Sequence, residues 1–338
     1  MTAEKPIGSL SLDLDNLWSY LKTHGDPGWT WFPSYLDVVI PRVLKVLEEF
    51  GLKITFFVVG QDAALPKNRE ALARIPAAGH EVANHSFHHE PWLHLYPAAK
   101  IEEEFQRAEE AIESATGREP IGFRGPGFSF SGNTLRAMMR RGYHYDASTF
   151  PTFLGPLART YYFLTTRLSP EEMEKRKRLF GKFSEGFRPL KPYRWRDNGR
   201  RLIEIPVTTL PGLKLPIHVS YVLYAGGFSK NLAMTYFRTA LRLCRHRGVP
   251  ASLLLHPLDF LGSDDVPELA FFPAMTQPAA AKVELTRRVI EEFRRRYNVV
   301  SMAEHAAVLA RSGWIREFPV PPEESGPLEV EVTRAGGV

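Results

Sequence analysis

Two histidines and two aspartates have the types and spacing that a metal site requires. His85 and His89 stand four residues apart, in a segment that follows a short apolar run and stops at Pro91. Two imidazoles at this spacing can converge on one cation. Asp13 and Asp15 lie at the end of the first apolar run, where two like carboxylates are costly unless they are paired or bind a metal. This pattern indicates a metal-dependent hydrolase.

Three further polar residues, Arg124, Asp146 and His256, fall at the ends of predicted strands. In barrel-like α/β folds that rim carries the active site. Each residue also has a simpler interpretation: a turn aspartate, a solvated arginine, or a core histidine in an apolar run. With eleven histidines in the chain, one histidine pair at this spacing can also arise by chance. The matching placement of all these residues favours a site.

Composition places the chain among ordinary globular proteins, with 338 residues, 44% hydrophobic and 24% charged. The single cysteine, Cys244, excludes an internal disulfide and a cysteine metal cluster. No apolar run reaches the ~20 residues that a membrane span needs. Because the N-terminus leads directly into a strand-like run without a signal peptide, we expect a cytoplasmic protein.

Strand and helix patterns alternate along the chain, which is typical of an α/β fold with a mostly parallel sheet or barrel. The segment from Asn16 to Ser34 is predicted to be a long aromatic loop. After Trp314 the sequence loses periodicity, so we expect a catalytic domain over 1–314 and an irregular tail over 315–338. Strands are predicted at 7–14, 53–60, 80–83, 121–124, 143–148, 202–206, 251–256 and 299–300.

A basic, aromatic insert at about 150–200 interrupts this rhythm. Residues 150–201 hold thirteen Lys/Arg against five Asp/Glu, a local charge of +8. Tyr161–Leu164 followed by Lys175–Arg178 suits peripheral contact with anionic lipid at the inner face of a membrane. A solvated helix face is the simpler interpretation of the charge run. No nucleic-acid module accompanies it, so we expect no nucleic acid partner.

In their order and combination these motifs resemble the polysaccharide deacetylase family, the NodB homology fold of the carbohydrate esterase family 4 superfamily. The family pattern is a strand-end aspartate pair, H-[ST]-x-x-H, R-x-P and leucine-x-histidine. The corresponding residues are Ser11–Asp15, His85–His89, Arg124–Gly127 and Leu254–His256, within about 7–312. The resemblance implies an irregular (β/α) barrel of about seven parallel strands, a NodB-type deformed barrel similar to the TIM barrel.

The sequence departs from the family pattern at three points. Leu14 separates the two aspartates, as in the cytoplasmic branch that includes allantoinase-like and lipid-sugar deformylase enzymes. Gly127 stands where tyrosine is common. The family's Asp-Trp motif is missing, so the residue that tunes the catalytic acid is open between Asp146 and Asp259.

On this resemblance Asp15, His85 and His89 hold a divalent metal, with Zn²⁺ or another first-row cation expected. Asp13 is the general base and Arg124 orients it. His256 protonates the leaving amine.

Substrate contacts are predicted at the backbone of Pro126 and Gly127, where an oxyanion is bound. Trp29 and Trp31 form either a sugar-stacking wall or a packed loop anchor.

The function that follows is hydrolysis of an N-acetyl or N-formyl group from an amino sugar of a glycan, or of a lipid-linked or nucleotide-linked sugar precursor. Two alternatives stay open. One is a metal-dependent amidohydrolase on a small non-sugar amide. The other is an inert carbohydrate- or lipid-binding module.

Overall fold

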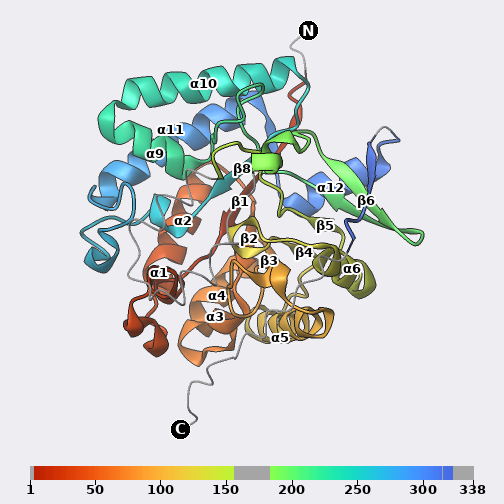
Figure 1. Cartoon of the computed structure of the whole chain (residues 1–338). Helices are drawn as coiled ribbons and strands as arrows, with labels where there is room; N and C mark the ends of the chain where they lie inside the picture. Colours follow the sequence, from red (N-terminus) through yellow and green to blue (C-terminus); the bar gives the residue numbers. More distant parts are fainter. Residues whose placement is uncertain (1–3, 156–182, 314, 323–338) are drawn as a thin grey trace.

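A central parallel sheet organises the chain (Figure 1). The computed structural model describes residues 4–155, 183–313 and 315–322. Neighbouring strands in the order β8-β1-β2-β3-β4-β5-β7 pair in parallel. These strands are β1 (Ile7–Asp13), β2 (Thr55–Val58), β3 (Glu81–Asn84), β4 (Gly122–Phe123), β5 (Tyr145–Asp146), β7 (Arg200–Glu204) and β8 (Ser252–Leu255).

Hydrogen bonds beyond β7 close this sheet into an irregular barrel. The Thr208 N–H donates to the Ser252 carbonyl at 3.0 Å, and the Ser252 N–H donates to Thr208 Oγ1 at 2.8 Å. The segment after β7 therefore joins β8, which already pairs with β1. The predicted barrel of about seven parallel strands is confirmed. A further strand, β9 (Asn298–Val300), also pairs with β1.

Helices surround the strands and bury their apolar faces against them (Figure 1). Ser131 and Ser301 cap α6 and α12, each in a capping box. No helix in the described ranges combines the length and apolar character of a membrane span. The helices are α1 (Leu17–His24), α2 (Leu36–Glu49), α3 (Gly60–Ala64), α4 (Arg69–Ala77), α5 (Ala98–Thr116), α6 (Gly132–Arg141), α9 (Val219–Phe228), α10 (Lys230–His246), α11 (Ala279–Arg296) and α12 (Met302–Arg311).

The segment predicted as an aromatic loop, 16–34, is mostly helical. It forms α1 and the 3₁₀ helix η1 (Pro27–Trp31). Asn16 caps α1 by accepting a hydrogen bond from the Leu17 N–H, and Gly25 ends it at φ 88°. The loop prediction was wrong because aromatic residues obscured a short helix whose start and stop signals are both present.

The insert and the tail contain strands that the sequence analysis did not predict. Within the insert, β6 (Tyr193–Asp197) pairs antiparallel with β7. Within the predicted irregular tail, β10 (Glu317–Pro319) pairs with β6. The described part of the tail is therefore regular at β10. The lipid-contact candidates Tyr161–Leu164 and Lys175–Arg178 lie outside the described residues.

A buried carboxyl from α3 fixes the chain that leaves β1. Asp62 is 1% exposed. Its Oδ1 accepts hydrogen bonds from Asn16 Nδ2 at 2.7 Å, Trp18 Nε1 at 2.9 Å and Asn68 Nδ2 at 3.1 Å. Its Oδ2 has no partner among the described residues. Burial raises the pKa of Asp62 to about 7, although the hydrogen bonds from Asn16 and Trp18 act in the opposite direction.

We predict that Asp62→Asn stabilises the protein increasingly as the pH rises from about 4 to about 7. The folded-state pKa of Asp62, about 7, lies above its ordinary value of 3.8. The contribution of Asp62 to the free energy of unfolding is therefore fully present below about pH 4. It is lost as the pH rises to about 7, because in this range the unfolded chain ionises the carboxyl more readily than the folded protein does. The loss is roughly 4 kcal/mol for three pKa units. Asparagine keeps Oδ1 as the acceptor for all three donors without the charge.

Thermal unfolding of wild type and Asp62→Asn in buffers across this pH range, with a chelator present, measures the effect. Asp37→Asn, at an exposed position of α2, is the matched control. A melting-temperature difference between wild type and Asp62→Asn that does not change with pH would contradict the prediction.

Candidate active site and metal centre

The barrel brings the predicted metal ligands together at the carboxyl ends of β1 and β3. Ligand atoms of Asp15, His85 and His89 lie within 4.8 Å of one another, and all three side chains are buried. The Nε2 atoms of His85 and His89 lie 3.3 and 2.9 Å from Asp15 Oδ1. Burial alone would raise the pKa of Asp15, but the charge on His89 and hydrogen bonds from both histidines hold it well below its usual value.

This donor set fits a divalent first-row cation. The Nδ1 of His85 lies 2.6 Å from the Arg124 carbonyl oxygen. Because a carbonyl only accepts, Nδ1 carries the proton and Nε2 is left as the ligand atom. Two imidazole nitrogens and one carboxylate oxygen are the ligands of many catalytic zinc sites. The geometry supports the predicted ligand set, and the identity of the metal stays a prediction.

Strained backbone presents the two histidines to Asp15. Ser86 and His89 adopt left-handed φ values of 61° and 51°, which are unusual for residues with a side chain. The Ser86 N–H donates to Asn84 Oδ1 at 2.8 Å. The N–H groups of Phe87 and His88 donate to Glu104 Oε2 at 3.2 and 3.1 Å.

Glu104 of α5 is therefore the anchor of the histidine segment. Its Oε1 also pairs with His88 Nδ1, so His88 supports the histidine segment and is not among the three grouped ligand residues. Burial acts to raise the pKa of Glu104, but the bonds from His88 and Phe87 lower it overall. The sequence analysis missed Glu104, because it lies on a helix among other glutamates.

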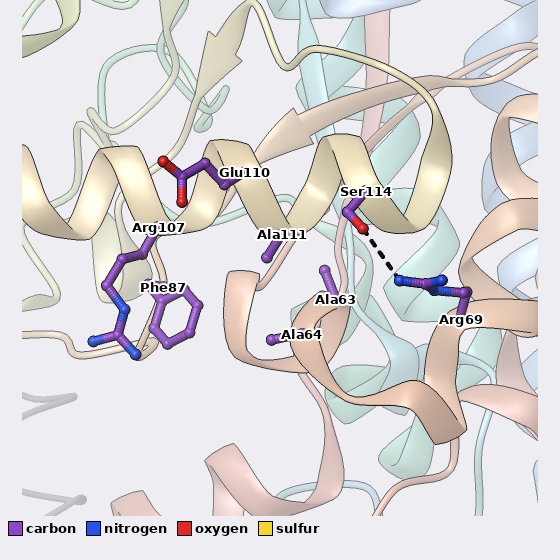
Figure 2. A pocket seen from close by; sticks show the side chains of 8 residues that line it. All are labelled: Ala63, Ala64, Arg69, Phe87, Arg107, Glu110, Ala111 and Ser114. Carbon is purple, nitrogen blue, oxygen red and sulfur yellow. Dashed lines mark hydrogen bonds between the residues drawn. The ribbon is translucent and has the colours of Figure 1, made fainter.

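Phe87 anchors the same segment on its outer side. Figure 2 shows its ring beneath Arg107, in a pocket between α3 and α5, with the Arg107 guanidinium carbon 3.9 Å from the ring centroid. A Cβ on Gly60 would lie 2.8 Å from this ring, so glycine is needed for the close approach. The pocket is open and its lining includes Arg69 and Arg107, both exposed. We assign it to anchoring of the loop.

On one side of the metal ligands lies the buried pair formed by Asp13 and Arg124. Arg124 is fully buried, and its Nη1 donates to Asp13 Oδ1 at 2.6 Å and to Ser11 Oγ at 2.9 Å. Its Nε donates to the Ala147 carbonyl at 3.0 Å, and its guanidinium lies 4.3 Å from the Phe57 ring. The guanidinium therefore fixes the orientation of the Asp13 carboxylate.

His256 directly follows β8, the strand that pairs with β1. Its Nδ1 lies 3.1 Å from Ser220 Oγ. Ser220 Oγ donates to Asp259 Oδ1 at 2.8 Å, and the His256 N–H donates to Asp259 Oδ2 at 2.8 Å. Burial raises the pKa of Asp259, with the charge of His256 acting against it.

Of the two candidates for tuning the acid, the structure favours Asp259. Asp146 Oδ1 accepts hydrogen bonds from the N–H and Oγ of Ser148, and its carboxyl pairs with that of Glu204. Burial raises the pKa of both Asp146 and Glu204. Asp146 therefore shares a buried contact with Glu204, away from His256.

The sequence analysis missed two residues beside His256, namely His218 and Ser220. The His218 ring centroid lies 5.8 Å from that of His256 and 5.4 Å from that of Phe150. Its Nδ1 is buried without a partner among the described residues. Burial, and then the charges of His256 and Arg124, hold the pKa of His218 well below its usual value, so its ring is neutral.

Two aromatic rings lie near the metal ligands: the Trp18 centroid is 6.4 Å from that of His89, and the Phe57 centroid is 6.3 Å from that of His85. Of the two tryptophans predicted to contact substrate, Trp29 is half-buried beside Phe32 and Trp31 is 84% exposed. The packed-anchor interpretation fits Trp29 better than the sugar-stacking one. For Trp31 the predicted contact with substrate stays a prediction.

The predicted oxyanion segment lies beside the histidine segment. Pro126 and Gly127 belong to the 3₁₀ helix η4 (Pro126–Phe128), in which Gly127 has φ 58°. A Cβ built on Gly127 would lie 3.2 Å from the Pro91 ring. Glycine thus allows the backbone at residue 127 to lie close to Pro91, at the end of the histidine segment.

Comparison with known proteins shows what this fold and site are similar to. Residues 26–145 match the family described as polysaccharide deacetylase. This part of the chain is therefore similar to the polysaccharide deacetylase family. A crystal structure of a candidate polysaccharide deacetylase from Mycobacterium smegmatis shares the fold, with 21% identity, a TM-score of 0.61 and coverage of 95% of this chain and 97% of the other.

Individual relatives match within a shorter region. A peptidoglycan deacetylase of Helicobacter pylori is 34% identical over 113 residues, which are 33% of this chain and 37% of that protein. A chitooligosaccharide deacetylase of Bradyrhizobium is 41% identical over 75 residues, which are 22% of this chain and 33% of that protein. The aligned regions therefore span well under half the length of these relatives.

We predict that Glu104→Ala weakens divalent metal binding by about 10- to 100-fold, the range seen when residues that support metal ligands are removed. Without Glu104 the N–H groups of Phe87 and His88 lose their acceptor, and the strained segment no longer presents His85 and His89 together. Competition with a chromophoric chelator measures the affinity. Glu113→Ala, at an exposed position of the same helix, should bind metal as wild type does. Equal affinities for wild type and Glu104→Ala would exclude this anchoring role.

Proposed function

We propose that this protein is a metal-dependent hydrolase that removes an N-acetyl or N-formyl group from an amino sugar. The observation that carries the proposal is the arrangement of a base and an acid around one donor set. Asp13, oriented by Arg124, ends β1 two residues before the ligand Asp15, and His256, supported by Ser220 and Asp259, follows β8, which pairs with β1. Amide hydrolysis needs both, because an amine leaves poorly unless it is protonated.

The side chains divide the reaction between them. A cation held by Asp15, His85 and His89 would supply polarisation of the amide carbonyl and a lowered pKa for a nearby water molecule. Asp13 accepts the proton of the attacking water, and Arg124 keeps its carboxylate pointed at that water. The backbone at Gly127 faces the oxyanion, where an N–H donor stabilises developing negative charge.

His256 then protonates the departing amine nitrogen. With Ser220 Oγ donating to Asp259, the serine oxygen is free to accept from His256 Nδ1–H. The serine and aspartate therefore fix the ring so that Nε2 faces the substrate.

The substrate class is inferred from the relatives together with the site. The Helicobacter pylori and Bradyrhizobium proteins are named for peptidoglycan and chitooligosaccharides, both of which contain N-acylated amino sugars. For this chain we infer an N-acylated sugar of a glycan, or of a nucleotide-linked or lipid-linked precursor in the cytoplasm. All residues of the proposed chemistry are present, which argues against an inert binding module.

Metal analysis of the purified protein with a panel of substrates tests the proposal. We expect one bound first-row divalent cation per chain, and release of acetate or formate from an N-acylated amino sugar. Release of product only from ureides or simple formamides would replace the proposal with the small-amide alternative. No hydrolysis of any amide by the metal-loaded protein would refute it.

We predict that Asp13→Asn lowers kcat by about 10²- to 10⁴-fold, the usual contribution of a general base, while metal content stays that of wild type. Asparagine keeps the hydrogen bond to Arg124 but cannot take a proton. Steady-state kinetics with metal analysis on the same sample measures both quantities. Full activity in the metal-loaded Asp13→Asn protein would remove Asp13 from the role of base.

We predict that Ser220→Ala lowers kcat by about tenfold with little change in KM, because one hydrogen bond that orients His256 is lost. Asp259 Oδ1 loses its donor at the same time, whereas Oδ2 keeps the hydrogen bond from the His256 N–H. Ser229→Ala is a useful comparison, since Ser229 caps α10 and does not belong to the hydrogen-bonded group of His256, Ser220 and Asp259. A change confined to KM would indicate that Ser220 contacts substrate instead.

A further inference from the structure

Exposed apolar side chains concentrate in one part of the described chain. Seven of the twelve exposed large hydrophobic residues fall within 183–232. Along the chain, that stretch runs from the end of the insert through β6, β7 and α9 to the start of α10. Surface clusters of this kind usually mark interaction sites. The seven are Phe183, Phe187, Leu213, Tyr221, Tyr224, Phe228 and Leu232.

Helix α9 carries the best-defined part of this cluster. Tyr221, Tyr224 and Phe228 are spaced by three and four residues, so they share one face of the helix. Their exposure rises along the helix from 37% to 50% to 80%, and Leu232 at the start of α10 is 71% exposed. Figure 1 shows α9 and α10 lying side by side at the edge of the molecule.

We call Tyr221, Tyr224, Phe228 and Leu232 the stripe. The chemistry of its side chains changes along the chain in the same direction as their exposure. Tyrosines, which have a polar tip, lie nearest the site, and purely apolar Phe228 and Leu232 lie farthest from it. Tyrosine is favoured at the headgroup level of a bilayer, and phenylalanine and leucine suit the acyl boundary beneath it. A surface built to stack sugars would instead keep rings with polar edges along its length.

The charge of the surrounding segment matches an anionic surface. Residues 205–258 hold six Lys/Arg and no Asp or Glu over 54 positions. Lys230 is exposed between Phe228 and Leu232, and Arg242 and Arg245 are exposed on the same helix α10. Cations near a membrane of anionic lipid each favour binding.

The stripe begins at the catalytic acid. Ser220, in the first turn of α9, hydrogen-bonds to His256, and the Tyr221 ring centroid lies 4.6 Å from that of His218. From Ser220 to Phe228 the helix rises about 12 Å, at 1.5 Å per residue. The exposed apolar end is thus one short helix away from the reacting groups.

We propose that α9 and the start of α10 form a membrane-contact surface that seats the barrel rim on a bilayer containing anionic lipid. The sugar of a substrate carried on a phosphate-linked lipid then reaches His256 from the membrane side. That second statement rests on the proposed function, whereas membrane contact itself does not.

Flotation of the full chain with vesicles of phosphatidylcholine, with and without phosphatidylglycerol, tests the proposal. We expect wild type to float with the anionic vesicles, less at high salt, and less with phosphatidylcholine alone. The double variant Phe228→Ser/Leu232→Ser should lose about tenfold or more of its vesicle affinity, since two exposed apolar side chains no longer enter the bilayer.

The matched control is Val38→Ser/Val308→Ser, which removes two exposed apolar side chains from α2 and α12. It should float as wild type does, and thermal unfolding checks that both double variants are folded. Wild type that stays in the soluble fraction with all vesicles would overturn the proposal. So would a Phe228→Ser/Leu232→Ser protein that floats as wild type does.

Turnover separates a lipid surface from a glycan platform. On an N-acetylated sugar carried by a polyprenyl phosphate in vesicles, Phe228→Ser/Leu232→Ser should be slower by about tenfold, whereas a water-soluble N-acetylated oligosaccharide should be turned over at the wild-type rate. Equal losses on both would overturn the membrane assignment in favour of glycan binding. Flotation without hydrolysis of any sugar would refute the proposed function and still support the membrane surface.

Discussion

One buried arginine connects the two halves of the chemistry. The Arg124 side chain holds Asp13, and the main-chain carbonyl oxygen of Arg124 accepts the Nδ1 proton of His85. The orientation of the base and the identity of the metal-binding nitrogen thus depend on the same residue. A fully buried arginine is costly unless its donors are used. Here Ser11 and Asp13 of β1, together with Ala147 just after β5, supply acceptors, so the barrel strands stabilise the charge that the site needs.

The histidine segment shows how a strained conformation is maintained. Left-handed backbone at Ser86 and His89 has a cost of order 1–3 kcal/mol per residue, which interactions outside the segment must offset. Asn84 and Glu104 accept its N–H groups, and the Phe87 ring packs between α3 and α5. The ligands are therefore held by a helix and a strand that do not contact the cation themselves.

Much of the site could be predicted because strand ends are visible in sequence. Asp13, His85, Arg124 and His256 each follow an apolar run, and parallel strands bring such positions to one rim. Supporting residues could not be found in that way. Glu104 and Ser220 lie on helices, where their partners depend on how the helix packs. The choice between Asp146 and Asp259 required the packing of Glu204, and the helix over 17–24 was obscured by aromatic residues that look like a loop.

The closure of the barrel has a consequence for how activity can be lost. The candidate metal ligands and the proposed base precede residue 125, whereas His256 follows β8, whose place beside β1 depends on the seam between Thr208 and Ser252. Damage to that seam would leave the cation-binding half intact and displace only the proton donor. Such a protein would bind metal normally and hydrolyse nothing. Within this fold, an intact metal centre is therefore no proof of an active enzyme, because the two halves of the site are assembled by different parts of the chain.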